Sequence, residues 1–150
     1  MPETPEIPPT ARKFGYPDNC IAETPHWLVL LRPQQVTYGA LVLVCREAVT
    51  AFGDVSAGAL AALQPVVKNI ECMLSEEMRY QKINYLMLMM VDQDVHFHVI
   101  PRYEGAREFA GMSFSDAGWP GPPRLDLAVS PPEDMQQALV RKLRGKWGGR

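Results

Sequence analysis

The stretch DVHFHVIPRY, residues 94–103, alternates polar and apolar side chains, and this alternation constrains the fold more than any other feature. Asp94, His96 and His98 occupy every second position, with apolar residues between them. Successive side chains of a β-strand point to opposite faces of the sheet. The three polar groups should therefore share one face of a strand, and the apolar face should be covered by a core.

Three further apolar runs have the length and composition of strands. Residues 26–32 and 40–45 are rich in Leu and Val, and residues 83–91 are apolar on both faces, as in a central strand. Asp92 and Gln93 follow the third run and predict a tight reversal. The third run and the histidine strand should then form an antiparallel hairpin.

Two segments have the periodicity of helices. Ser56 can cap a helix whose apolar side chains recur at three- and four-residue steps; they are Leu60, Leu63, Val67, Ile70 and Leu74. Pro65 lies within this helix and should kink it or split it. Ser130 with Pro131 should begin a second helix, acidic early and basic late. The elements indicate an α+β fold: an antiparallel sheet of four to five strands, one long helix packed on it, and a C-terminal helix.

The 150 residues have the length of one domain with an added arm and tail. Prolines crowd residues 1–19, which predicts an extended or disordered N-terminal arm. Residues 20–105 should hold the α+β domain. Residues 106–150 should form a Gly/Pro-rich loop and a C-terminal helix that pack on the same domain.

Charge and cysteine content exclude several classes of protein. A formal net charge of -2 gives no general attraction to nucleic acid or to a membrane. The three cysteines are widely spaced, which argues against a disulfide framework and a thiolate zinc site. Without a secretion signal or an apolar run long enough to span a bilayer, we expect a cytoplasmic location.

Two chemistries fit the polar row. Asp94, His96 and His98 could bind a divalent metal, as two histidines and a carboxylate do in some iron sites. Alternatively, one imidazole attacks a phosphorus atom while its neighbours handle charge and protons. His26 has no patterned neighbour and is expected to be structural.

The segment VHFHVIPR, residues 95–102, resembles the signature strand of the histidine triad (HIT) superfamily of nucleotide hydrolases and transferases. The order of elements over residues 20–105 is also similar, and GWPGPP resembles a Trp-Pro segment of a bacterial branch. The resemblance implies a HIT-like homodimer that needs no metal or other cofactor. His96 would attack the α-phosphate of a nucleotide, such as a dinucleoside polyphosphate, and form a nucleotidyl-histidine intermediate, from which water would release the monophosphate. His98 would stabilise the phosphate and the leaving group.

The chain departs from the family pattern near the phosphate. Asp94 replaces the first triad histidine, where a carboxylate repels phosphate unless it is protonated or turned toward an imidazole. No residue of LVLLRP, residues 28–33, corresponds to the acid or amide that holds the ribose in the family. The remaining candidates for substrate binding are Asn84, Gln93, Arg102 and Trp119. These departures leave open a nucleotide-binding protein with little catalysis.

Overall fold

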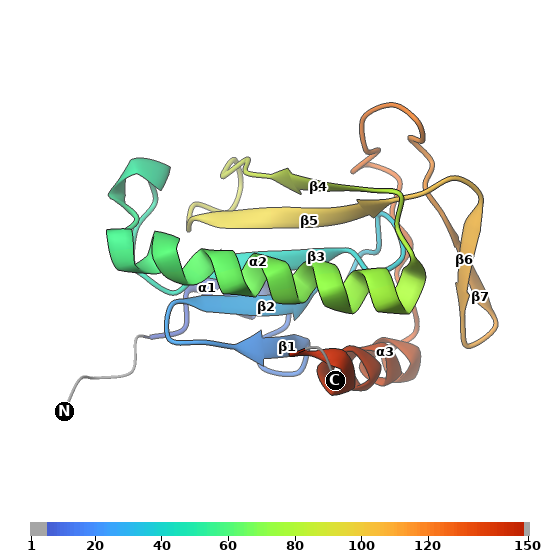
Figure 1. Cartoon of the computed structure of the whole chain (residues 1–150), viewed down its shortest axis with the longest axis horizontal. Coiled ribbons are helices and arrows are strands. Elements are labelled where there is room, and N and C mark those ends of the chain that lie inside the picture. The colour runs from blue at the N-terminus through green and yellow to red at the C-terminus, as the bar shows by residue number, and fades with distance from the viewer. Residues whose placement is uncertain (1–5, 149–150) are drawn as a thin grey trace.

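A five-stranded antiparallel sheet is the centre of the computed structural model, which describes residues 6–148 (Figure 1). The strand order is β1-β2-β3-β5-β4. The strands are β1 (Cys20–Glu23), β2 (Trp27–Leu31), β3 (Leu41–Cys45), β4 (Lys82–Leu86) and β5 (His96–Arg102), and β6 (Ala106–Phe109) and β7 (Met112–Ser115) form a separate hairpin. The predicted α+β class is confirmed, with a sheet of five strands, a long helix and a C-terminal helix.

The long helix α2 (Ala57–Met78) begins where the sequence predicts. The Ser56 hydroxyl accepts a hydrogen bond of 3.0 Å from the Ala59 amide, as an N-cap does. Pro65 does not split the helix, which is continuous over 22 residues. A short 3-10 turn, η1 (Phe52–Asp54), precedes it.

The C-terminal helix α3 (Glu133–Lys146) begins later than predicted. Its N-cap position is Pro132, without a side-chain cap, so the predicted cap at Ser130 is wrong. A residue that precedes a proline avoids the helical conformation. Because Ser130 and Pro131 each precede a proline, the helix can begin only beyond the second one. The acidic first turn and basic last turn are confirmed.

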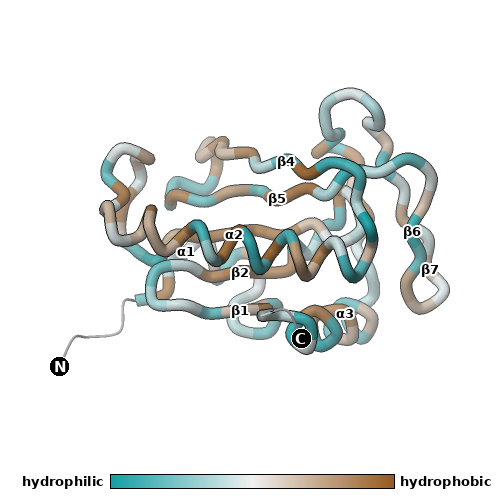
Figure 2. Tube along the Cα trace, viewed as in Figure 1, coloured by the Kyte–Doolittle hydropathy of each residue, from teal (hydrophilic) through white to brown (hydrophobic). Residues whose placement is uncertain are grey.

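One face of the sheet packs against α2, which lies in front of the strands in Figure 1. Apolar and polar segments alternate along α2 in Figure 2, as expected for a helix with one buried side. Ile70 and Leu74 are fully buried, as predicted, but Leu60 is 43% exposed. The buried stripe is centred on Val66, Ile70 and Met73, and the predicted Leu63 and Val67 are partly buried beside it and pack against the core.

The opposite face is covered by α1 (Pro9–Lys13) and Phe14. This cluster comprises Ala11, Phe14, Cys20, Leu28, Leu30, Val42 and Val44. The expectation of an extended or disordered arm over residues 1–19 is therefore wrong from residue 9 onward, where α1 begins; residues 1–5 lie outside the described part. The prolines start a helix, because the fixed φ of Pro9 suits the first helical turn.

The segment between β4 and β5 is longer than predicted. β4 pairs with β5 only over Lys82–Leu86, and residues 87–95 form the connection. The tight reversal at Asp92 and Gln93 is therefore wrong. Met90 and Val91 are 84% and 83% exposed, so the end of the apolar run lies in a loop instead of a strand.

A second hairpin lies where the sequence suggests only irregular structure. Ala110 and Gly111 both have positive φ and connect β6 to β7 in two residues. Such a turn matches the twist of paired strands. The sequence FAGM lacks the Asn-Gly or Asp-Gly pair that usually indicates it.

Phe14→Ala tests the docking of α1 on the sheet. Phe14 is 6% exposed, and we expect its truncation to lower the free energy of unfolding by about 3 kcal/mol because a buried ring is lost. Phe52 is 49% exposed, so Phe52→Ala should cost less than about 1 kcal/mol. Urea unfolding measures both. Equal small effects would mean that the arm does not dock.

Candidate functional site

His96 and His98 lie side by side on β5, on the sheet face that α1 covers. His96 is paired with Val44, and His98 lies between Val42 of β3 and Leu86 of β4. The two imidazole centroids are 5.1 Å apart, and the residues are only 2% and 8% exposed. The structure therefore brings the two predicted histidines together in a nearly closed site.

Phe14 covers both imidazoles. Its ring centroid lies 6.4 Å from that of His96 and 6.0 Å from that of His98, edge-on to the latter. An aromatic ring in this position excludes water and lowers the local dielectric constant.

Asp94 lies two residues before β5, so it is not part of the strand as predicted. Its carboxylate Oδ2 accepts hydrogen bonds from the amide and hydroxyl of Thr10, at 3.1 and 2.8 Å. Its backbone oxygen lies 2.6 Å from Nδ1 of His96. A carbonyl only accepts, so Nδ1 holds its proton and Nε2 is the basic nitrogen of the neutral ring.

This geometry does not assemble the alternative metal site. The Asp94 carboxylate is turned toward Thr10, and Nδ1 of His96 donates to a carbonyl. Among residues 6–148, no three His, Cys, Asp or Glu side chains are grouped so that they could hold a metal ion.

His98 is uncharged at neutral pH. Burial lowers its pKa to about 4, and the charges of His96 and Arg32 act in the same direction. Its Nδ1 is buried without a hydrogen-bond partner among the described residues. In the free protein the neutral His98 ring can therefore offer one N–H.

A cavity of about 370 Å³ opens onto the two histidines. Its polar lining includes Lys13 of α1, Arg32 and Gln34 after β2, and Asp92 of the β4–β5 connection. Lys13 Nζ forms an ion pair of 2.8 Å with Asp92. Neither Lys13 nor Arg32 was among the predicted site residues, because no local motif marks them and only the fold brings them to β5.

Arg102 lies on the histidine face but serves a different site. Its guanidinium pairs with Asp116 at 2.7 Å and donates to Asn84 Oδ1 at 2.8 Å and to the Gly121 carbonyl at 2.8 Å. Asn84, Arg102 and Trp119 border a second cavity of about 590 Å³. Four residues of strand, about 13 Å, separate His98 from Arg102.

Gln93 is exposed and borders a shallow depression beside Thr10 and Asp94. None of the four predicted substrate-binding residues lines the cavity of the histidines.

His98 should make stability depend on pH. Its folded-state pKa of about 4 lies below the ordinary value of 6.5, so the unfolded chain binds the proton more readily. The free energy of unfolding should therefore be highest above pH 6.5. It should decrease as the pH falls to 4, by up to about 3 kcal/mol. Urea unfolding of wild type and His98→Asn across this range measures the difference, and His26→Asn is the control. An identical pH dependence in His98→Asn would contradict the assignment.

Comparison with solved structures shows that the fold is similar to that of histidine triad proteins. A histidine triad protein from Bradyrhizobium japonicum is 20% identical, with 97% of this chain and 99% of that chain covered and a TM-score of 0.73. One from Sinorhizobium meliloti is 21% identical, with 95% and 96% covered and a TM-score of 0.73. Diadenosine triphosphate hydrolase from Plasmodium falciparum is 9% identical, with 86% and 76% covered and a TM-score of 0.60.

Comparisons at the level of sequence find no relative. No protein-family model matches the chain, and no curated protein matches it. Among the described residues, no helix is long and apolar enough to cross a membrane. The likeness to known proteins that the comparisons show therefore rests on the fold.

Proposed function

We propose that the protein is a nucleotide hydrolase or nucleotidyl transferase with His96 as its nucleophile. The observation that carries this proposal is the hydrogen bond from Nδ1 of His96 to the Asp94 carbonyl. It fixes the tautomer in which Nε2 has a free lone pair, inside a cavity that Arg32 and Lys13 also line. The histidine triad fold and the name of the Plasmodium hydrolase support the same chemistry.

The reaction would proceed in two displacements. The Nε2 lone pair of His96 attacks the α-phosphate of a nucleotide, an N–P bond forms, and the P–O bond to the leaving group breaks. Water, or another acceptor, then attacks the same phosphorus and breaks the N–P bond. The released product is a nucleoside monophosphate or its ester, and His96 is regenerated.

His98 and Asp94 would assist in different ways. The neutral His98 can donate its N–H to a phosphate oxygen, and bound phosphate raises the pKa of that imidazole by attraction to the charged form. Asp94 is a positioning residue, because its backbone oxygen orients His96 while its carboxylate holds α1 through Thr10.

His96→Asn tests the nucleophile. We expect chelator-treated wild type to release nucleoside monophosphate from at least one of three substrate classes: dinucleoside polyphosphates, nucleoside phosphoramidates and sugar nucleotides. His96→Asn should lose this turnover at least a thousandfold, because the Asn amide cannot attack phosphorus as the imidazole does. The matched control is His26→Asn, which removes a histidine outside the site and should retain full turnover.

Other outcomes separate the alternatives. Full activity in His96→Asn would disprove the nucleophile. Turnover that returns only when a divalent metal is added would favour the metal site. Binding of nucleotide without turnover would favour a binding protein, a reading supported by the 2% exposure of His96.

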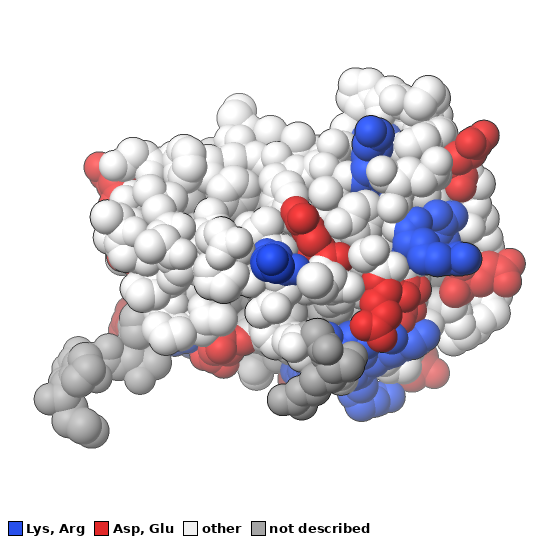
Figure 3. Space-filling view, in the orientation of Figure 1, with Lys and Arg blue, Asp and Glu red and all other residues white. Residues whose placement is uncertain are grey.

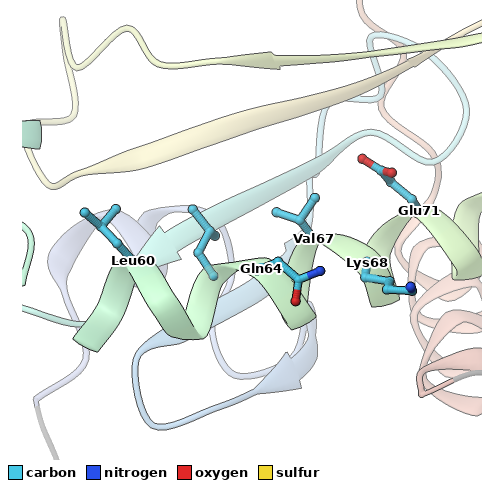
Figure 4. A pocket seen from close by; sticks show the side chains of 6 residues that line it. Leu60, Gln64, Val67, Lys68 and Glu71 are labelled. Atoms are coloured by element: carbon cyan, nitrogen blue, oxygen red, sulfur yellow. The ribbon is translucent and has the colours of Figure 1, made fainter. Parts of the chain in front are cut away.

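We also propose that two copies associate through β4 and α2. β4 is an edge strand, and its described pairing is with β5 alone. Beside it, Leu60, Leu63 and Val67 of α2 border a cavity of about 500 Å³ (Figure 4). Charged side chains are sparse over the first half of α2 and over β4 in Figure 3. An unpaired edge next to apolar side chains suits an identical partner.

Analytical ultracentrifugation tests the dimer. Wild type should sediment at twice the chain mass of 16.8 kDa. Val67→Glu should convert it to a monomer, because the interface would bury an unpaired charge. Leu127→Glu places the same charge on a side chain that is 49% exposed away from α2 and should remain dimeric. A monomeric wild type would refute the proposal.

A further inference from the structure

Arg32 is placed to reach the histidine cavity from two strands away. It directly follows β2, and its amide donates a 3.0 Å hydrogen bond to the Ala40 carbonyl. It shares the sheet face of Leu28 and Leu30, which is the face of the histidines. Only β3 separates β2 from β5, so their backbones lie about 10 Å apart.

The small side chain of Ala40 leaves room for the Arg32 side chain to extend from β2 toward β5. Ala40 is the small residue beside Arg32 and is fully buried, so a long side chain can lie across it. The guanidinium borders the cavity together with His98, and its charge is one reason why the pKa of that imidazole is low.

The charge of Arg32 is not balanced within the described residues. Its guanidinium donates to the Gln34 carbonyl at 2.6 Å, but no carboxylate of residues 6–148 pairs with it, and its Nε is buried without a partner. Burial lowers the pKa of the Arg32 guanidinium. The guanidinium of Arg102, by contrast, is neutralised by an ion pair with Asp116. An unpaired, partly buried guanidinium is unfavourable unless an anion joins it.

The rest of the cavity adds no compensating charge. Lys13 and Asp92 neutralise each other in their ion pair. His98 is uncharged, and its Nδ1 is also without a partner. Arg32 is therefore a cation of the cavity lining without a carboxylate partner among the described residues, next to an imidazole with unused hydrogen-bonding capacity.

We propose that Arg32 binds a second phosphoryl group of the substrate, joined through a bridging oxygen to the phosphoryl group that His96 attacks. This inference deepens the proposed function and rests on it for the position of the first phosphoryl group. A guanidinium can hold two phosphate oxygens at once, which suits a fixed second anion. The protein then selects diphosphate-type substrates over monophosphates.

Calorimetric titration with inorganic pyrophosphate and inorganic phosphate tests the subsite. Wild type should bind pyrophosphate at least tenfold more tightly than phosphate, and Arg32→Gln should reduce this ratio toward one. Arg124→Gln is the matched control, because Arg124 is exposed and paired with Asp126 outside the cavity; it should keep the wild-type ratio. Equal binding of the two anions by wild type, or an unchanged ratio in Arg32→Gln, would overturn the proposal.

Two further variants separate this proposal from folding effects and from the proposed chemistry. Arg32→Lys keeps the charge but not the two-pronged contact, so it should retain a reduced preference for pyrophosphate; if it behaves like Arg32→Gln in a folded protein, the charge is not the cause. His96→Asn should keep the preference for pyrophosphate over phosphate although it catalyses no reaction. If His96→Asn retains turnover while Arg32→Gln loses the preference, the nucleophile is wrong and the subsite stands.

Discussion

The burial of both faces of the sheet at β2 and β3 determines the rest of the structure. Every residue of Trp27–Leu31 and Leu41–Cys45 is fully buried, so each face needs a cover. The helix α2 supplies one cover, and α1 with Phe14 supplies the other. Because β5 lies beside β3, the second cover extends over His96 and His98. The burial of the two imidazoles and the lowered pKa of His98 follow from that cover.

The hydrogen bond to His96 also explains how the chain accommodates an acid at position 94. The oxygen that fixes the His96 tautomer belongs to the backbone, and any residue can supply it. The side chain at this position is then free to take another role. In this protein the Asp94 carboxylate receives two hydrogen bonds from Thr10 and so ties α1 to the start of β5. The carboxylate is bonded to those donors, so it does not take the place of a triad imidazole.

The two proposals for the cavity concern different steps. His96 would make and break the bond to phosphorus, whereas Arg32 would decide which phosphates enter. The second cavity, beside Arg102 and Trp119, is a separate site. Its Arg102 guanidinium is already neutralised by the buried ion pair with Asp116. Arg102 is buried with its carboxylate, whereas the partly buried Arg32 has no carboxylate partner among residues 6–148. This contrast is why we propose Arg32 as the residue that binds the ligand.

The sequence alone determined the features that depend on local periodicity. The alternation in residues 94–103 predicted that His96 and His98 share a face, and the apolar spacing after Ser56 predicted α2, because strand and helix periods are properties of neighbouring residues. Tertiary structure decided the docking of α1, the start of β5 after Asp94, and the convergence of Arg32 with the histidines. Thr10 and Asp94 are 84 residues apart in the chain. Such contacts depend on which faces must be buried together, and no local pattern records them.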